Sequence, residues 1–496
     1  MTTFHLVWLF LTLIFGSYPN DLARAVDLAT TFRLHTIAQI HTNNVTALST
    51  TVGEGLEPCD TEQTMPEAIV LSTEDPWSAA LTDSTQPGTQ FLLHGGLYQA
   101  TDKLWLKAGT PSTPLLIKPY NCEAVTIQGS IRPNSDTTIA GIKIRAFGID
   151  DIKWAIRFDG KNGGTITNTI LRNNTILGGT IDAIRLSGDV HNIRIEGNHI
   201  DGGESGHDIF VTAETSGLQP SAITITQNRL TKQYFDQASE DMIQVRDTGA
   251  ITITGNVCTD GLNMEQCIDI KSTTAPLLIA YNVFDGDNLH LLGKGEDLSG
   301  GCMVIHESDG HPEQHLIEHN SFHHCKGTAI RFASGLRDEQ SSALLRYNLF
   351  LQSKITDGTI LVEEATDLHF ISNSVILGEL KLGNSSQTRF PQNTVVQHNI
   401  FYQTAIDDNL LPSAAAYDCA YNLLYQLEGD GFSTASCSHT VNADPQFLDI
   451  VESDFHLQPG SPALGSGENG SDLGALPMKF PPEGLIYAVY LPFVLP

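Results

Sequence analysis

The sequence ILRNNTI at residues 170–176 decides the fold, because it sets alternating apolar residues beside an asparagine, Asn174. The phrase returns as IRIEGNHI at 193–200, ITITQNRL at 223–230 and ITITGNVC at 251–258. Its asparagines are Asn174, Asn198, Asn228, Asn256, Asn282, Asn320, Asn348, Asn373 and Asn399, with Asn422 as a further member. The first nine follow one another at intervals of 24 to 38 residues, and such a period is typical of a solenoid.

Each repeat is too short for a crossover helix, so its alternating apolar residues predict short β-strands and one coil per repeat. A second strand phrase precedes each asparagine phrase, and its inward-facing residues form a column: Ile156, Ile184, Ile209, Ile243, Ile268, Met303 and Ile330. Asparagine can adopt the left-handed conformation and bond to its neighbours, which predicts an asparagine ladder at one corner. We therefore predict an all-β, single-stranded parallel β-helix of about ten or more coils.

The two ends of the repeat region contain further features. Residues 87–99 read PGTQFLLHGGLYQ, and residues 442–467 read NADPQFLDIVESDFHLQPGSPALGSG. These segments resemble the opening coils and the closing segment of the pectate-lyase-like superfamily, over roughly residues 75–477. The resemblance implies a right-handed β-helix in an exported, carbohydrate-active protein. It selects no single activity, because the superfamily includes lyases, hydrolases, epimerases and adhesins.

The chain divides into five segments. We expect a signal peptide at 1–25, an N-terminal cap at 26–74, the β-helix at 75–440, its closing segment at 441–477 and a short apolar tail at 478–496. Residues 6–16 are apolar but too few to span a bilayer, and Ala23-Arg24-Ala25 fits a cleavage site. An uncleaved anchor is the alternative. We expect a secreted or cell-surface protein with no later membrane span, and we favour a packed strand over a sorting signal for the tail.

Export permits disulfides, and the chain contains eight cysteines without a C-x-x-C pair, which argues against a zinc or redox motif. Two pairs bracket the repeat region, and we predict the disulfides Cys59–Cys122 and Cys419–Cys437. Spacing alone leaves other pairings open.

The formal net charge is −30. A field of this sign repels nucleic acids and anionic membrane surfaces, so we expect neither as a partner. It would also repel an acidic polysaccharide, unless a bound cation or a local basic patch reverses the field. We expect a monomer.

Charge is concentrated on three consecutive coils, at residues 239–247 (SEDMIQVRD), 265–272 (EQCIDIKS) and 301–308 (GCMVIHES). In register, Glu240 stacks on Glu265 and Gln244 on Asp269, about 4.8 Å apart. The acidic group comprises Glu240, Asp241, Glu265 and Asp269, with Asp208 one coil earlier. Carboxylates so close repel each other unless a cation neutralises them or a proton is shared, and oxygen-rich clusters suit Ca²⁺. Solvated surface acids without a metal are the alternative.

A basic column, Arg246 on Lys271 on His306, follows the acidic group. Like charges at this spacing would lower the pKa of Lys271 toward that of a usable base. The alternative is an ordinary salt bridge from Lys271 to Asp269. Some pectate lyases combine a lysine base with a calcium cluster written Asp-Asp-Gly-x-Asp. Residues 240–244 resemble that cluster, with glutamate for its first aspartate and Gln244 for its last.

Together these groups predict a Ca²⁺-assisted polysaccharide lyase that performs β-elimination on a uronic-acid glycan. Ca²⁺ would bind the substrate carboxylate, Lys271 would abstract the C5 proton, and Arg246 or His306 would stabilise the enolate or assist the leaving oxygen. Two alternatives stay open. One is a glycoside hydrolase that uses a carboxylate pair such as Asp241 and Asp269. The other is a non-catalytic, carbohydrate-binding or surface-structural β-helix. The adjacent His323 and His324 also suggest a metal, but corner positions explain them more simply.

Overall fold

The structure is a computed structural model that describes residues 68–475, except 84–87, 101–102, 148, 150–151, 162–163, 215–216, 234–239, 292–300, 307–314, 334–341, 353–358, 384–390, 409–410, 412–416, 430 and 433–436. The predicted signal peptide, almost all of the predicted cap, Cys59 and the apolar tail lie outside the described residues. No helix among the described residues is long and apolar enough to cross a membrane.

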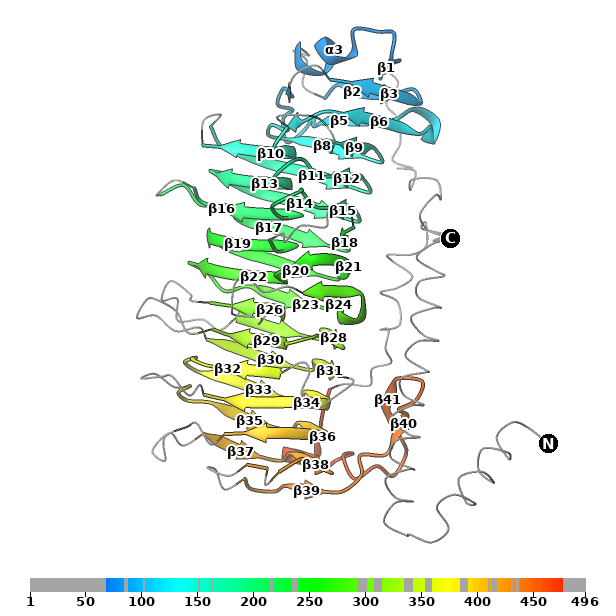
Figure 1. Cartoon of the computed structure of the whole chain (residues 1–496). Coiled ribbons are helices and arrows are strands. Elements are labelled where there is room, and N and C mark those ends of the chain that lie inside the picture. Colours follow the sequence, from blue (N-terminus) through cyan, green and yellow to red (C-terminus); the bar gives the residue numbers. More distant parts are fainter. Residues whose placement is uncertain are drawn as a thin grey trace, which may run out of the picture. The chain divides into compact units, whose positions relative to one another are not determined.

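The chain winds into coils of three strands, and each strand pairs in parallel with its counterpart in the next coil (Figure 1). One coil, for example, consists of β13 (Asp182–Gly188), β14 (Val190–Glu196) and β15 (His199–Asp201). Equivalent strands form three stacks, which we name the first, second and third in the order in which the chain visits them. The second stack alone contains 14 strands, which confirms the predicted parallel β-helix of ten or more coils.

The strands of each stack follow in chain order. The first stack contains β4 (Leu104–Trp105), β7 (Ile131–Arg132), β10 (Trp154–Gly160), β13, β16 (Ile209–Thr212), β19 (Ile243–Thr248), β22 (Gln266–Thr273), β26 (Gly301–Ile305), β29 (Thr328–Phe332) and β32 (Thr359–Val362). The second contains β1 (Ile69–Leu71), β2 (Gln90–Leu93), β5 (Leu115–Pro119), β8 (Thr137–Ala140), β11 (Ile166–Arg172), β14, β17 (Ser221–Thr226), β20 (Ile251–Thr254), β23 (Leu278–Ala280), β27 (His315–Glu318), β30 (Ala343–Arg346), β33 (Leu368–Ile371), β35 (Val395–Gln397) and β37 (Asp418–Ala420). The third contains β3 (Gly96–Gln99), β6 (Val125–Gln128), β9 (Lys143–Arg145), β12 (Thr175–Leu177), β15, β18 (Arg229–Lys232), β21 (Val257–Met264), β24 (Val283–Asp285), β28 (Ser321–His323), β31 (Leu349–Leu351), β34 (Ser374–Leu382), β36 (Ile400–Asp407), β38 (Leu423–Tyr425) and β39 (Val441–Asn442).

The predicted inward column is confirmed. Its members pair in register from coil to coil and are fully buried: Ile156, Ile184, Ile209, Ile243, Ile268, Met303 and Ile330. Phenylalanines stack in the same core, with ring centroids 4.5 Å apart for Phe284 and Phe322 and 4.7 Å for Phe322 and Phe350. Apolar burial of this kind is the main favourable term in folding, and a solenoid repeats it in every coil.

Hydrogen bonds join the repeated asparagines into a ladder at the corner between the second and third stacks. The Nδ2 group of each asparagine donates to Oδ1 of the asparagine in the next coil, over 3.0–3.2 Å, from Asn174 to Asn422. The same Oδ1 also accepts the backbone N–H of the ladder asparagine in the preceding coil. The backbone N–H of Asn256, for example, donates to Asn282 Oδ1 over 3.0 Å. Every member is at most 1% exposed, so each bond holds a buried polar group.

The left-handed conformation falls on the residue before each ladder asparagine, and not on the asparagine itself as the sequence suggested. These preceding residues have φ between 52° and 65° and vary in type: Asn173, Gly197, Gln227, Gly255, Tyr281, His319, Tyr347, Ser372, His398 and Tyr421. A left-handed residue turns the chain sharply, which directs the following amide into the ladder. Because the corner dictates the backbone, the side chain at the turn can vary and projects outward, and Tyr281 stacks on His319 at 4.8 Å.

Both ends of the stack have additional elements. At the N-terminal end, helix α3 (Trp77–Asp83) buries Trp77 and Leu81, and Trp77 packs edge-to-face on Tyr98 at 5.3 Å. At the C-terminal end, the antiparallel pair β40 (Phe447–Asp449) and β41 (Asp454–Leu457) packs Phe447 against a second hydrophobic cluster outside the main core. This pair lies beside the third stack in Figure 1.

The disulfide Cys419–Cys437 forms as predicted. Cys122 is also disulfide-bonded, but its predicted partner, Cys59, lies outside the described residues. Two further disulfides, Cys258–Cys267 and Cys302–Cys325, connect parts of successive coils near the charged segments.

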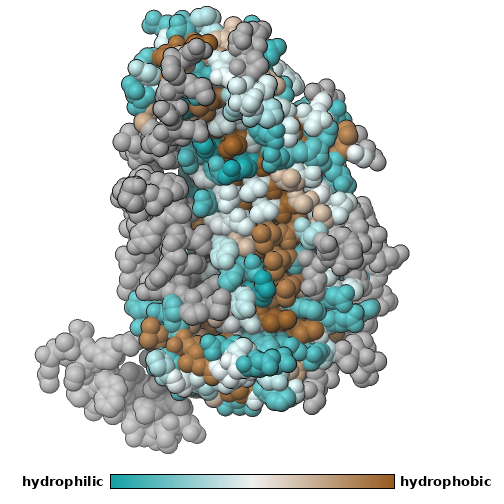
Figure 2. Space-filling model, turned by 180° about the vertical axis from the view of Figure 1, so that it is seen from behind, coloured by the Kyte–Doolittle hydropathy of each residue, from teal (hydrophilic) through white to brown (hydrophobic). Residues whose placement is uncertain are grey.

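The face seen from behind has a band of hydrophobic residues that runs along the stack (Figure 2). Outward positions of the second stack contribute apolar residues, since Leu278, Leu316 and Leu344 are register partners and only half-buried. Because scattered and aligned apolar residues are common on protein surfaces, this band defines no site by itself.

We expect Asn282→Ala to lower the free energy of unfolding by about 2–4 kcal/mol, because it removes bonds to Asn256, Asn320 and the Ile253 carbonyl and leaves buried groups without partners. Urea unfolding followed by circular dichroism measures the loss. Gln397→Ala is the matched control, since it deletes an amide whose bond to Asp418 is exposed, and it should cost less than about 1 kcal/mol. Equal losses in the two variants would contradict a stabilising ladder.

Candidate functional site

The three charged segments lie on consecutive strands of the first stack, as predicted. Strand β19 pairs with β22 and β22 with β26, and Gln244 is the register partner of Asp269. Outward side chains near the strand ends therefore meet on one wall of the solenoid. The residues that follow His306 in the third segment lie outside the described part of the chain.

Asp269 is the centre of this wall. Its carboxylate is buried, with 1% of the side chain exposed, yet Lys271 Nζ lies 2.6 Å from Oδ2 and His306 Nε2 lies 3.2 Å from Oδ1. Lys271 and His306 keep about a third of their side chains exposed, at 38% and 34%. Burial alone would raise the pKa of Asp269, but His306 and Lys271 outweigh burial and hold that pKa below its ordinary value. One buried anion thus holds two accessible nitrogen groups side by side.

The predicted basic column is wrong in two respects. First, the register shifts between Val245 and Arg246, so that Arg246 pairs with Ser272 and Lys271 falls at the irregularity. Arg246 is exposed and lies 3.7 Å from Asp247. Second, the pKa of Lys271 is raised and not lowered: burial opposes its charge, but the attraction of Asp269 outweighs burial. The alternative given from the sequence, an ordinary salt bridge from Lys271 to Asp269, is confirmed at 2.6 Å, and this carboxylate is the dominant neighbour of Lys271.

Asp241 lies beneath the same wall and shares an amide with Asp269. The side chain of Gln244 donates to Asp241 Oδ2 at 2.8 Å and to Asp269 Oδ2 at 3.3 Å, and Asp241 Oδ1 accepts the backbone N–H of Gln266. Burial and the nearby charge of Asp269 raise the pKa of Asp241 well above its ordinary value. The Gln244 amide therefore connects two buried carboxyl groups with opposite shifts: the pKa of Asp241 is raised and the pKa of Asp269 is lowered.

A histidine that the sequence reasoning missed joins the acidic group. His207 is the neighbour of Asp241 in the preceding coil, and ligand atoms of His207, Glu240 and Asp241 all lie within 4.8 Å of one another. His207 Nδ1 lies 2.9 Å from Asp182, while its buried Nε2 faces Asp241 Oδ2 at 3.9 Å, beyond hydrogen-bond reach. An imidazole held by a carboxylate on one nitrogen, with the other aimed at two acids, is an arrangement that suits a metal ligand. The aligned strand phrases already placed His207 in the column of Asp241.

The remaining two predicted ligands, Asp208 and Glu265, differ in their surroundings. Asp208 is fully buried and packs beside Lys232, and both side chains press against Gly202, where a Cβ atom would lie 2.1 Å from Asp208 Oδ1. Burial raises the pKa of Asp208 well above its ordinary value. Glu265 is half-buried and near enough to affect the pKa values of Asp241 and Lys271. The five predicted carboxylates therefore do not converge on one open point.

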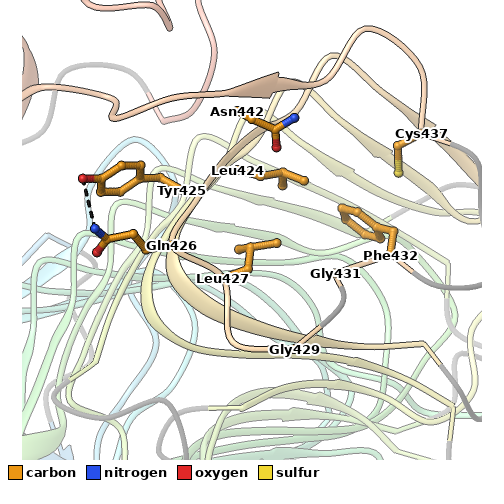
Figure 3. A pocket seen from close by; sticks show the side chains of 9 residues that line it. All are labelled: Leu424, Tyr425, Gln426, Leu427, Gly429, Gly431, Phe432, Cys437 and Asn442. Atoms are coloured by element: carbon orange, nitrogen blue, oxygen red, sulfur yellow. Dashed lines mark hydrogen bonds between the residues drawn. The ribbon is translucent and has the colours of Figure 1, made fainter. Parts of the chain in front are cut away.

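A cavity of about 430 Å³ lies elsewhere, at the C-terminal end of the solenoid (Figure 3). It is lined mainly by uncharged groups, including Leu424, Leu427 and Phe432. A hydrogen bond of 3.2 Å, from the Gln426 amide to the Tyr425 hydroxyl, spans its rim. The described residues of its lining include no carboxylate, lysine or histidine and so offer no acid–base group, which makes the charged wall the better candidate.

No family model matches the chain, and no curated protein matches it in sequence. Several solved structures are similar to it. The PL6 family alginate lyase AlyGC matches with a TM-score of 0.48 and 14% identity, over 86% of this chain and 59% of its own, so this chain spans less than two thirds of it. A mannuronic acid specific polysaccharide family 6 lyase from human gut microbiota gives 0.48 and 17%, over 75% and 90%. A GH136 lacto-N-biosidase from Eubacterium ramulus gives 0.47 and 13%, over 72% and 67%. At these identities the likeness concerns the fold alone, so the side chains must carry the functional argument.

A second buried group depends on pH: Asp201, at the end of β15, two coils before the coil of β19. Asp201 is 2% exposed and accepts a hydrogen bond from Thr231, and burial raises its pKa to about 7, although Lys232 opposes the shift and Asp260 adds to it. Between its ordinary pKa and about pH 7, the unfolded carboxyl ionises while the folded one keeps its proton. The free energy of unfolding therefore falls as the pH rises through this window and levels off above it.

Asp201→Asn removes this titration while keeping the size of the side chain. We expect the variant to be about 4 kcal/mol more stable than the parent at about pH 8 and equal to it near pH ~4, because a rise of the pKa from its ordinary value to about 7 corresponds to about 4 kcal/mol. Urea unfolding at both pH values measures the difference. A variant that is less stable at the higher pH would show that Asp201 folds as an anion paired with Lys232.

Proposed function

We propose that this protein is an extracellular polysaccharide lyase that cleaves a uronic-acid glycan by β-elimination at the wall around Asp269. The observation that supports it is the pair of accessible groups, Lys271 and His306, held 2.6 and 3.2 Å from one buried carboxylate. Successive strands of the first stack form a continuous wall, and such a wall suits a chain-like substrate. The described disulfides support export, since such bonds persist in oxidising compartments.

Lys271 and His306 exchange the roles that the sequence suggested, in which Lys271 was the base and His306 stabilised the enolate or assisted the leaving oxygen. Because Asp269 keeps Lys271 protonated, Lys271 serves as a fixed positive charge and His306 as the base. A histidine whose Nε2 faces a carboxylate presents Nδ1 as the proton acceptor, as in other base–orienter pairs. Asp269 touches no substrate and acts as a positioning residue.

The elimination then follows from these positions. His306 takes the C5 proton, the negative charge that develops on the uronate carboxylate lies against the Lys271 ammonium, and the C4–O bond breaks as the C4–C5 double bond forms. The proton held by His306 passes to the departing oxygen, which leaves the histidine neutral for the next cycle. No further reactant is needed.

A divalent cation has a candidate place near this wall, formed by His207, Glu240 and Asp241. The buried Nε2 of His207, 3.9 Å from Asp241, fits a metal that lies between them. An imidazole ligand favours Zn²⁺ or Mn²⁺ over the predicted Ca²⁺, which takes oxygen ligands. Because His207 Nε2 and the Asp241 side chain are buried, a cation bound there would act without touching the substrate: it would lower the negative charge near the wall and so reduce the repulsion between an acidic glycan and this protein.

The hydrolase alternative has less support at this wall. Its predicted carboxylate pair, Asp241 and Asp269, has 0% and 1% of the side chains exposed, so neither can flank a glycosidic bond. A non-catalytic β-helix is the remaining alternative, and the following measurements distinguish it from a lyase.

Variants of Lys271 test its role as a charge. With pectate, alginate and glycosaminoglycans as substrates, ultraviolet absorbance of the unsaturated product measures the rate. We expect Lys271→Ala to lose about 10²–10³-fold in kcat, and Lys271→Arg to stay within about tenfold of the parent because it keeps the charge. His306→Ala should lose about 10²–10⁴-fold.

Arg246→Ala is the matched control, because Arg246 is also basic and is more exposed than Lys271, and the described structure gives it an ion pair with Asp247 and none with Asp269. Its rate should stay near that of the parent. If Lys271→Arg is as inactive as Lys271→Ala, lysine is the base, as the sequence suggested. If the parent releases no unsaturated product from any polyuronate, the protein is not a lyase.

Removal of metal tests the cation. After dialysis against a chelator, we expect weaker binding of polyuronate, and Zn²⁺ or Mn²⁺ should restore it at lower concentration than Ca²⁺. Calorimetry of the metal with the parent and with Glu240→Gln measures the binding directly. A preference for Ca²⁺ would contradict a histidine ligand and would support the cluster of oxygen ligands that the sequence predicted.

A further inference from the structure

A second group of metal-binding side chains lies in the same two coils as the proposed lyase site, but at the end of third-stack strands and not on the first-stack wall. Asp287 belongs to the short 3-10 turn Gly286–Asn288 after β24, and His323 and His324 end the equivalent segment of the next coil at β28. One ligand atom from each of the three residues lies within 4.8 Å of the others. From these contacts we propose that Asp287, His323 and His324 form a site for a transition metal of the Zn²⁺ class.

The backbone brings two successive imidazoles to one carboxylate, which a regular strand cannot do. Neighbouring side chains of a strand point to opposite faces. Here His324 has φ of 47°, in the left-handed region that costs a non-glycine residue about 1 kcal/mol. This turn brings the ring centroids of His323 and His324 to 3.9 Å. Asp287 Oδ2 then lies 2.7 Å from His324 Nδ1 and 3.7 Å from His323 Nδ1.

The surroundings of the three residues are constrained. A Cβ atom on Gly286 would lie 2.3 Å from the His324 carbonyl oxygen, so only glycine allows the turn with Asp287 to approach this strand end. The backbone N–H of His324 donates to Leu351 at 2.7 Å, and the next residue, Cys325, is bonded to Cys302. The three side chains are between 12% and 26% exposed, so a metal could enter while the ligands stay in place.

The ligand chemistry selects the class of metal. Two imidazole nitrogens and one carboxylate suit Zn²⁺ and its first-row neighbours, whereas Ca²⁺ and Mg²⁺ prefer oxygen alone. Bonds of about 2.0–2.2 Å place tetrahedral ligands roughly 3.3–3.6 Å apart, close to the 3.7 Å between Asp287 and His323. The 2.7 Å between Asp287 and His324 is a hydrogen bond, which would open by about 0.6–0.9 Å when a metal replaces its proton. Such an ion would connect two successive coils, because Asp287 and the histidine pair belong to different coils. The interval between Asn282 and Asn320, which includes Asp287, is the longest between the first nine ladder asparagines.

The test uses the full chain, freed of metal, and titrates it with Zn²⁺ by calorimetry and with Co²⁺ by visible absorption. His207→Ala serves as background, because it disables the other proposed cation site and leaves this one intact. We expect one equivalent of Zn²⁺ in that background and an intense, tetrahedral Co²⁺ spectrum. Adding His323→Gln or Asp287→Asn should weaken this equivalent at least about tenfold, and adding His319→Ala, a surface histidine of the same coil, should not.

Retained affinity in both His323→Gln and Asp287→Asn would overturn the site, as would the absence of bound metal in the His207→Ala background. If a variant unfolds, X-ray absorption of the Zn²⁺-loaded background protein decides instead. Two imidazole nitrogens and one or more oxygens around zinc support the site, and one imidazole or none rejects it. None of these results depends on lyase activity, so the outcome is separate from that of the proposed function.

Discussion

Registered parallel pairing between coils, maintained by buried asparagine amides, is the constraint on which the rest of the structure depends. Each ladder amide satisfies a neighbour on both sides and adds a bond to a carbonyl of the preceding coil, as Asn282 does with Ile253. A slip of one residue would leave these groups buried without partners and would turn the apolar column outward. The same register places Gln244 beside Asp269 and His207 beside Asp241. The positions of the side chains on the wall around Asp269 therefore depend on the register that the ladder maintains.

The architecture was predictable because it repeats. Alternation in ILRNNTI and its copies defined the strands, and one aligned column was enough to assign the inward first-stack residues from Ile156 to Ile330. Local backbone detail was less predictable. The left-handed residue precedes each asparagine, and at that position the chain uses residues as different as Gln227, Gly255 and Tyr281. The corner imposes the left-handed conformation, so the residue type at that position says little about the backbone. Only the asparagine that follows it, which recurs from coil to coil, marks the corner in the sequence.

The candidate site was predicted in part. Strand alignment correctly placed Glu240, Asp241, Asp269, Lys271 and His306 on neighbouring coils, because such alignment reports which residues share a wall. It could not report the irregularity after Val245, which separates Arg246 from Lys271. Nor could it weigh burial against attraction, which decides that Lys271 keeps its proton. His207 stands in the column of Asp241, but a lone histidine adds no formal charge to the sequence pattern, so the pattern did not distinguish it from a core residue.

The short strands at the two ends of the second stack have a consequence for how copies of the molecule meet. Strands β1 and β37 contain three residues each, helix α3 packs near one end, and the β40–β41 pair lies near the other. A stack of parallel strands is a natural template for another chain to extend, and brief, partly covered edges offer few groups to bond. Terminal strands this short therefore disfavour end-to-end addition of a second copy, which matters for a protein whose interior is one continuous cross-strand lattice.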